Sequence, residues 1–470
     1  MGQNGPMDEA HLRSRSLWWD QIDGPLTARP RLDADTDVDV AIVGGGFTGL
    51  WTAYSLLEAD PSLNVLVIEG EVVGFGASGR NGGWCVGELA GGFPAAKKRW
   101  GDFEGRKMTR AIMDTVDVVG KVVADEGIEC GFSKGGAVRV AGNGAQLDRQ
   151  RKEVRLYANN GFENDVVELD LSEAARRLNA SKVLGGLYQV HAARIQPAAL
   201  ARGLAEAVEK RGGRIVEQTK VIRIDSGSPA SAVTESGVVT APTVVRATEG
   251  YTRTLAGQSR TLLPIYVQMV ATEPLSEHIW GQIGLAEREV FADDRHLVIY
   301  GQRTEDGRLA FGSQGAAYAF GSRLNEKLEQ NENVSEDIAE TLCSLLPVLR
   351  GVEITHRWGG VLGMARDSQP GVVLDRTQGL AWAGGYGGEG VAAANLAGRC
   401  LADLITKPGE KTELTALPWV GHRSRGWEPE PLRWLGVRAA QGAAAHADRV
   451  EDRKDRPSLL SAVTTGIFGV

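Results

Sequence analysis

Three glycines near the N-terminus have the spacing that a dinucleotide site requires. Gly44, Gly46 and Gly49 directly follow the apolar run DVDVAIV at 37–43. In this pattern the first glycine permits a tight turn, the second lets the backbone approach a pyrophosphate, and the third lets a helix pack closely on the strand. An acidic residue, Glu69, lies about 20 residues further on, where a carboxylate can reach ribose hydroxyls. This combination predicts a dinucleotide site more strongly than a glycine turn alone.

Two more glycine-rich segments lie downstream. The run GFGASGRNGG at 74–83 is too rich in glycine for a packed helix, and its backbone N–H groups could serve a pyrophosphate or the edge of a flavin ring. A flexible surface loop is the alternative. The segment GGYGGEGV at 384–391 precedes a predicted helix, whose start can stabilise negative charge. A simple nicotinamide enzyme has no need of this second cluster, so the segments favour a flavin.

Short strands and helices must position these glycine turns. Val- and Ile-rich runs at 37–43 and 65–68 are typical of buried strands, and a helix is predicted between them from about 48 to 58. A helix that starts with a proline is predicted over 197–210, and the strand after it, at 219–224, should return to the first sheet. Two further short strands are predicted within 238–247, and another at 380–383.

The remaining segments predict a second region of different architecture. Apolar residues at helical spacing predict a helix over 104–125, followed by a strand at 135–140. Short apolar runs between turn signals predict an antiparallel sheet from about 258 to 320. Helices are predicted at 335–346 and 431–448. The first 36 residues should form an irregular arm that Trp18 and Trp19 anchor.

Composition excludes several classes of protein. The chain has 470 residues, of which 42% are hydrophobic and 24% charged, so it can bury a large core in two or three lobes. A net charge of -8 disfavours a nucleic-acid surface. The four cysteines are far apart and the histidines show no paired spacing, so neither disulfides nor a metal site is expected. No apolar run approaches the roughly 20 residues of a membrane span, and no secretion signal is recognisable, so a cytoplasmic location is expected.

Taken in order along the chain, the motifs resemble those of the D-amino-acid oxidase, glycine oxidase and sarcosine oxidase superfamily. Within it the chain is most similar to the gamma-glutamylputrescine oxidoreductase branch. The resemblance depends on VGGGFTGL at 43–50, the 74–83 run, Trp-Gly-Gly at 358–360 and the 384–391 segment. It implies an α/β fold, in which a Rossmann-like domain binds FAD tightly and an α+β substrate domain contains a mixed or antiparallel sheet.

The resemblance also implies a division of the chain into four parts. These are an N-terminal arm (1–36), a discontinuous FAD-binding domain (37–100, 190–255 and 355–410), a substrate-binding domain (101–189 and 256–354) and a C-terminal helical extension (411–470).

Cofactor-binding residues follow from the same resemblance. It implies that the first glycine turn holds the pyrophosphate, that Glu69 binds the adenosine ribose, and that backbone groups of Val221 meet the adenine. Residues 77–83 would pass the flavin, and 384–391 would close over its pyrimidine end. The expected set is Gly44, Gly46, Phe47, Thr48, Gly49, Glu69, Gly70, Gly76, Ala77, Ser78, Arg80, Asn81, Gly82, Gly83, Val221, Gly360, Gly385, Tyr386, Gly387, Gly388, Glu389, Gly390 and Val391.

Four residues are expected on the substrate side, namely Tyr386, Arg303, Tyr300 and Trp358. Arg303 matches in approximate position an arginine of this branch and could hold a substrate carboxylate, or it could form a structural salt bridge. Tyr386 and Tyr300 could face the substrate or only pack, and Trp358 is expected beside the flavin. Glu389 replaces the uncharged or basic residue expected between these glycines, and it could attract a cationic amine.

The implied reaction oxidises a C–N bond of a primary or secondary amine, of amino-acid or polyamine type. Hydride passes to flavin N5, and water hydrolyses the resulting imine. Oxygen or another electron acceptor would then reoxidise the flavin. Two alternatives remain at this stage: an NAD-dependent dehydrogenase built on the same strand-helix-strand unit, and a flavoprotein subunit without catalytic activity.

Overall fold

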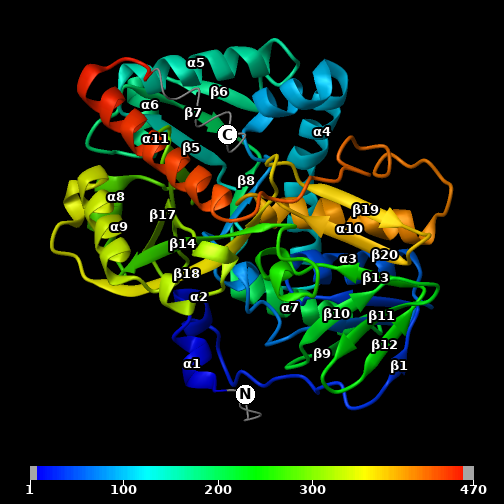
Figure 1. The fold of residues 1–470 in the computed structure, drawn as a ribbon. Coiled ribbons are helices and arrows are strands. Elements are labelled where there is room, and N and C mark those ends of the chain that lie inside the picture. The colour runs from blue at the N-terminus through cyan, green and yellow to red at the C-terminus, as the bar shows by residue number, and fades with distance from the viewer. Residues whose placement is uncertain (1–7, 459–470) are drawn as a thin grey trace.

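The computed structural model describes residues 8–458, with only the backbone for residues 314–317. Two large sheets organise this part of the chain, and Figure 1 shows them in different halves of the molecule. A four-stranded sheet and a two-stranded sheet complete the strand structure of the described residues. The arrangement confirms the expected α/β class with a mixed sheet in the second half.

A six-stranded sheet carries the first glycine motif. Its order is β19-β20-β13-β2-β3-β9, and all neighbours are parallel except β19 and β20. Three helices, α3, α7 and α10, bury their apolar side chains against one face of it. The strands are β2 (Val40–Val43), β3 (Val65–Ile68), β9 (Arg214–Val216), β13 (Thr243–Arg246), β19 (Gly371–Asp375) and β20 (Leu380–Gly384), and the helices are α3 (Phe47–Ala59), α7 (Pro197–Lys210) and α10 (Gly390–Thr406).

The strand predicted at 219–224 does not return to this sheet. It forms β10 (Val221–Asp225) at the edge of the four-stranded sheet, together with β1 (Thr36–Asp37), β11 (Ala230–Thr234) and β12 (Val238–Ala241). The three residues of β9 pair with β3 instead, because they are the first extended residues after the turn that ends α7. The prediction therefore assigned this strand to the wrong sheet. The four-stranded sheet covers the face of the six-stranded sheet that α3 and α10 leave open.

The second large sheet has eight strands in the order β18-β14-β17-β16-β15-β5-β7-β6. Only β15 and β5 are parallel neighbours, so the sheet is mixed. Its strands are β5 (Ala137–Ala141), β6 (Val166–Leu169), β7 (Gly185–Gln189), β14 (Leu263–Thr272), β15 (Val290–Asp293), β16 (Ile299–Arg303), β17 (Leu309–Ala317) and β18 (Ile354–Met364). The predicted boundary at residue 355 thus falls inside a strand of this sheet, while the rest of the domain division stays a prediction.

Helices and a short ribbon surround the eight-stranded sheet, and one of the helices, α4 (Gly92–Asp125), also packs against α10 of the first sheet. The other helices are α5 (Gly144–Ala158), α6 (Leu171–Arg177), α8 (Glu277–Ile283) and α9 (Glu332–Leu345), and single 3-10 turns are η2 (Glu249–Thr254), η3 (Phe320–Ser322), η4 (Glu326–Leu328) and η5 (Pro347–Leu349). The ribbon pairs β4 (Trp84–Val86) with β8 (Ala192–Arg194). α4 starts earlier than predicted and is interrupted at Gly101, whose backbone is not helical.

The N-terminal arm is more ordered than its composition predicts. It contains α1 (Glu9–Arg13) and α2 (Leu17–Asp20), each started by a side-chain cap, from Asp8 and Ser16. Trp18 and Trp19 are buried, which confirms that they anchor the arm. Residues 1–7 of the predicted arm lie outside the described residues.

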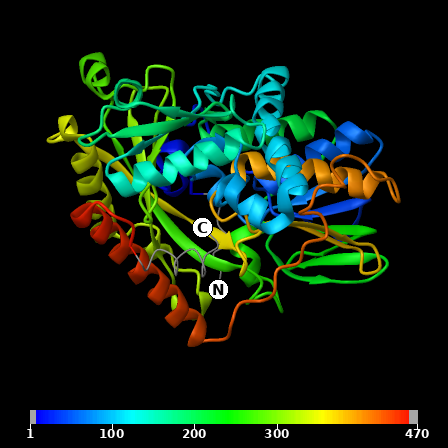
Figure 2. The same cartoon turned by 90° about the horizontal axis from the view of Figure 1, so that it is seen from above.

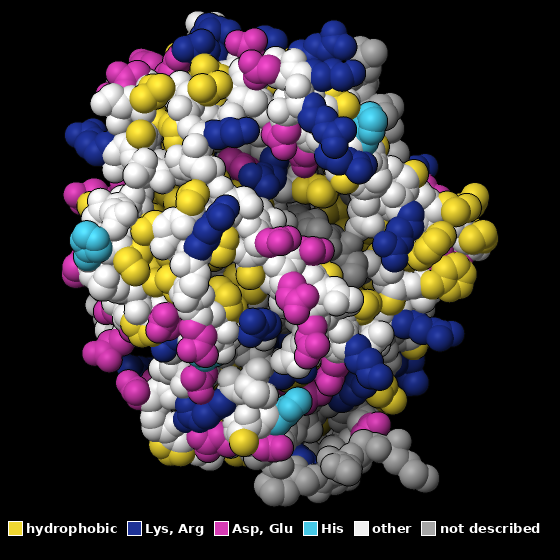
Figure 3. All heavy atoms as spheres, turned by 90° about the vertical axis from the view of Figure 1, so that its left-hand side faces the viewer, with side chains coloured by type: hydrophobic (Ala, Val, Ile, Leu, Met, Phe, Trp, Pro, Cys, Tyr) yellow, Lys and Arg dark blue, Asp and Glu magenta, His cyan; other side chains and the backbone are white. Residues whose placement is uncertain are grey.

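The predicted C-terminal helix is α11 (Leu432–Lys454), and Figure 2 shows it at the outer edge of the molecule, away from α10. Residues 459–470 of the predicted extension lie outside the described residues. On the face in Figure 3, basic and acidic side chains are interspersed. Between residues 8 and 458, every helix is too short or too polar to cross a membrane.

Candidate active site

The first glycine turn leaves no room for side chains. Gly44 has a φ of +112°, and a Cβ on it would lie 2.5 Å from the Ala247 carbonyl oxygen. A Cβ on Gly49 would lie 2.0 Å from the Gly44 carbonyl oxygen. Only glycine allows the start of α3 to approach β2 and β13 this closely. The result is a cradle of bare backbone at the carboxyl edge of the sheet.

Two N–H groups of this cradle donate to oxygen atoms of neighbouring side chains. Gly45 N–H donates to Glu69 Oε2 at 2.6 Å, and Phe47 N–H donates to Ser78 Oγ at 2.9 Å. Burial raises the pKa of Glu69 to about 7, although its backbone hydrogen bonds oppose that shift. Donors at the start of α3 and an acidic residue at the end of β3 are the groups that bind the pyrophosphate and ribose of a dinucleotide.

The 74–83 segment is fixed by buried contacts rather than being a flexible surface loop. It includes one 3-10 turn, η1 (Ala77–Gly79). Arg80 is buried and donates to Glu329 at 2.7 Å, to the Gly359 carbonyl oxygen at 3.1 Å and to the Tyr251 hydroxyl at 2.8 Å. Glu329 also pairs with Arg15 of the arm, so a single buried carboxylate joins this segment to the N-terminus.

The second glycine cluster meets the first. The Tyr386 hydroxyl lies 3.2 Å from Thr48 Oγ1, so the turn before α10 touches the first residues of α3. The two helices pack side by side on the same face of the six-stranded sheet (Figure 1). Gly385 and Gly387 have φ values of +81° and +66°, which side chains rarely adopt. Two helix starts that are far apart in the sequence therefore converge on one region.

Other expected cofactor residues lie around the same region. A Cβ on Gly360 would approach Ala77 and Arg80, so β18 runs against the 74–83 segment. Trp358 is buried and donates to the Arg80 carbonyl oxygen at 3.0 Å. Val221 starts β10 close to the end of β3, because the Thr219 N–H donates to the Glu69 carbonyl oxygen at 2.8 Å.

The sequence did not point to Glu249, although it belongs to the site. Its carboxylate accepts the N–H groups of Gly385 at 3.1 Å and of Tyr386 at 3.2 Å. Burial raises its pKa to about 7. Glu249 comes shortly after β13, just as Glu69 comes after β3. An acidic residue at the end of a parallel strand was therefore the sequence signal that could have identified Glu249 as a site residue.

Tyr300 and Arg303, two of the residues expected to contact substrate, lie on opposite faces of β16. Tyr300 packs against Gly82, where a Cβ would lie 2.7 Å from the ring, and it meets Trp84 edge-on at 6.2 Å. Arg303 is an odd number of residues further along and points to the other face. There it pairs with Glu277 at 2.5 Å and lies 4.6 Å from the Trp280 ring. The structure thus does not bring Arg303 to Tyr300, because strand alternation places them on different faces. The contacts of Arg303 are those of a structural salt bridge, which was the alternative to a role in substrate binding.

Two acidic residues and one arginine interact electrostatically beside the second glycine cluster. Burial raises the pKa of Glu389 to about 7 and that of Glu88 to about 8, and the charge of Arg139 lowers both. Arg139 comes from β5, where it pairs with Glu153 at 2.5 Å. The charge of Glu389 also acts on Tyr300. These groups form an acidic region beside the second glycine cluster.

The fold and the paired glycine turns define a dinucleotide-binding oxidoreductase. The family profile described as FAD dependent oxidoreductase (DAO) matches residues 39–404. The chain therefore belongs to the DAO family of FAD-dependent oxidoreductases.

Individual relatives agree with that family. Gamma-glutamylputrescine oxidoreductase of Escherichia coli (strain K12) is 30% identical over 82% of this chain and 87% of that protein. A probable oxidoreductase, OrdL, of Rhizobium meliloti (strain 1021) is 30% identical over 85% of this chain and 90% of that protein. The solved glycine oxidase of Geobacillus kaustophilus has a TM-score of 0.69, with 20% identity over 82% of this chain and 99% of that chain.

The family settles two open alternatives. Its members use FAD, so the nicotinamide dehydrogenase alternative was wrong, and its named relatives are oxidoreductases, which supports an enzyme over a subunit without activity. Among the described residues, no group of three or more His, Cys, Asp or Glu side chains could hold a metal ion.

Proposed function

We propose that this enzyme oxidises a C–N bond of a primary or secondary amine by transferring hydride to FAD. The proposal is supported by the named relatives, which include gamma-glutamylputrescine oxidoreductase and sarcosine oxidase subunit beta. When bound, FAD would supply the hydride acceptor at N5, and water would hydrolyse the imine product. The protein's own groups have to hold the cofactor, place the reacting C–H bond and attract the amine.

The cradle between the two glycine clusters fits FAD. We assign the pyrophosphate to the N–H groups at the start of α3 and the ribose to Glu69, because backbone donors and a carboxylate lie at the ends of adjacent parallel strands. The 74–83 segment, with Gly360 and Trp358 behind it, would support the flavin. The turn at 385–391 would meet its pyrimidine end, where the start of α10 stabilises negative charge.

The observation that favours an amine is the acidic region beside the second glycine cluster. Glu389 and Glu88 share this region with a single arginine, which already pairs with Glu153, so the region attracts cations increasingly as the two carboxyl groups ionise above about pH 7 to 8. Tyr300 and Trp84 give the region an aromatic wall, which suits the carbon chain and the ammonium group of an alkyl amine. We therefore favour a polyamine-type or other cationic substrate over a simple carboxylic acid.

Anaerobic reduction of the purified, FAD-loaded enzyme tests the proposal. Diamines, N-acylated diamines and amino acids should be compared with hydroxy acids of similar length. We expect the flavin absorption to bleach with an amine, and Glu389→Gln should raise the amine concentration needed for half-reduction. Glu410→Gln, an exposed change, serves as the control. Bleaching by a hydroxy acid and by no amine would contradict the proposal.

The acceptor and the location belong to the same proposal. We propose oxygen or a separate electron acceptor for reoxidation, and peroxide release compared with reduction of an artificial acceptor distinguishes them. We also propose a cytoplasmic enzyme, because all four cysteines are free thiols.

A further inference from the structure

A cavity lies on the opposite face of the six-stranded sheet from α3 and α10. Its volume is about 360 Å³, within the range of small-molecule sites. Strand alternation defines the face: Val245 packs in the core beneath the helices, whereas its neighbours Val244 and Arg246 point to the cavity. The sheet itself therefore lies between this cavity and the helix starts that form the candidate active site, and the two meet at Gly384, which lines the edge of the cavity.

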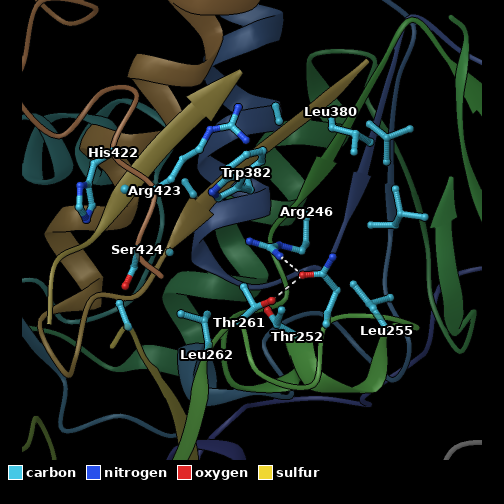
Figure 4. Close-up of a pocket in the computed structure, with 18 of the residues that line it drawn as sticks. Arg246, Thr252, Leu255, Thr261, Leu262, Leu380, Trp382, His422, Arg423 and Ser424 are labelled. Carbon is cyan, nitrogen blue, oxygen red and sulfur yellow. Dashed lines mark hydrogen bonds between the residues drawn. The ribbon is translucent and has the colours of Figure 1, made fainter. Parts of the chain in front are cut away.

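The wall of the cavity combines an apolar surface with a few polar groups. Leu255, Leu262, Leu380 and Val244 supply the apolar part. The polar groups include Arg246 of β13, Thr252, Gln258 and Thr261 of the segment after it, and residues 422–424. Figure 4 shows Arg246 and Thr261 on the two sides of one hydrogen-bonded side chain. An apolar wall with a small number of convergent polar groups is the usual composition of a ligand site.

Arg246 is the cation of this cavity that no carboxylate neutralises directly. Its Nη1 donates to Gln258 Oε1 at 2.7 Å, and Gln258 in turn accepts from the Thr261 hydroxyl at 2.7 Å. Among residues 8–458, no Asp or Glu lies within ion-pair distance of Arg246. Burial lowers its pKa to about 10, and Glu249 is the one charge that opposes this shift. A half-enclosed cation with a neutral partner gains from an anion that enters beside it.

The other charged groups of the cavity already have partners. Arg423 lies 4.6 Å from the Trp382 ring and pairs with Asp375 at 3.1 Å, and His422 pairs with Asp367 at 2.9 Å. Arg246 lies 5.6 Å from the same ring, and Figure 4 shows Trp382 between the two guanidinium groups. With one uncommitted positive charge, the cavity suits a single negative charge better than a phosphate dianion.

We propose that this cavity is a second ligand site, which binds a small organic monocarboxylate through Arg246 and places its apolar body against Leu255, Leu262 and Leu380. The guanidinium fork can bind both oxygens of a carboxylate, as its planar geometry favours. The proposal concerns a face of the sheet that amine oxidation does not use.

Calorimetric titration of the FAD-loaded enzyme tests the site. The probe is 4-methylpentanoate, and the neutral 4-methylpentanamide, which has nearly the same shape, is the matched ligand. We expect saturable binding of the acid with a Kd below about 1 mM, binding of the amide at least about tenfold weaker, and an unchanged flavin absorption spectrum. Failure of amine oxidation would leave this result unaffected, because the measurement needs no turnover.

Three variants make the outcome decisive. Arg246→Gln should weaken acid binding at least about tenfold, whereas Arg350→Gln, an exposed change, should not alter it. If Arg246→Gln does not fold, Ser424→Trp decides, because it fills the cavity from a loop without changing the sheet. Equal binding of acid and amide would overturn the proposal. So would acid binding that both cavity variants retain, a perturbed flavin spectrum, or no saturable binding up to about 10 mM.

Discussion

Replacing Gly49 with alanine should disrupt the cofactor cradle more than any other small change in α3. The added Cβ would lie 2.0 Å from the Gly44 carbonyl oxygen and 3.2 Å from Ile42 Cγ2. Ordinary contact needs a separation near 3.4 Å, so helix and turn must move apart by about 1.4 Å. Overpacking of this kind costs about 1–3 kcal/mol, which exceeds the gain of up to about 1 kcal/mol from alanine's helix propensity.

The same displacement should weaken FAD binding. If one charge-assisted hydrogen bond to the pyrophosphate is lost, at about 1.5–3 kcal/mol, the Kd for FAD rises about 10- to 100-fold. Titration of FAD-free protein by flavin fluorescence measures the affinity, and thermal unfolding measures the stability. The matched control is Gly442→Ala in α11, where a Cβ meets nothing within 4 Å and helix propensity should raise the stability. If Gly49→Ala gains stability as Gly442→Ala does, and binds FAD like the native enzyme, the close-packing argument is refuted.

Three other changes test other parts of the site. Glu329→Gln should lower the free energy of unfolding by about 3–5 kcal/mol, because Arg80 loses its buried charged partner. Urea unfolding measures this, with the exposed Glu332→Gln as the control. Equal shifts of the urea midpoint in the two variants would contradict the prediction. Tyr300→Leu should lower kcat/KM for the amine about tenfold, because it removes the tyrosine ring from the aromatic wall, while leaving FAD affinity unchanged. Equal loss of both in steady-state and binding assays would show a structural role instead. In the FAD-free protein, burial raises the pKa of Glu69 from 4.5 to about 7, so the folded state binds its proton more tightly and stability should fall as the pH rises from 4.5 to 7. Melting temperatures across that range should depend less on pH in Glu69→Gln, and parallel curves would refute the assignment.

The sequence predicted the parts of the fold that local pattern determines. The helix expected at 197–210 is α7 with the same bounds, because Pro197 begins it and the Gln196 side chain caps it. The strand, turn and helix around Gly44 were equally clear, since each glycine has a separate steric role. The resemblance to a known family then placed the second glycine cluster in the same site, which no local rule could do.

What the sequence could not predict depends on register and on long-range pairing. The three residues of β9 are too few to show a pattern, so the longer run at 219–224 was placed in the wrong sheet. Arg303 shows a second limit: a shift of one residue moves a side chain to the other face of a strand, and the sequence does not give the register. Glu249 and Arg139 reach the site only through the packing of distant segments.

The hydroxyl contact between Thr48 and Tyr386 joins residues 338 positions apart. During synthesis, the nucleotide half of the site therefore emerges long before the strand and helix that complete it. Until α10 is made, the side of α3 around Trp51 and Thr52, against which Gly398 of α10 packs, has no permanent cover. The nascent chain thus exposes an apolar, aggregation-prone surface for most of its translation. Stable binding of the flavin nucleotide has to wait until the ribosome has passed the last glycine turn.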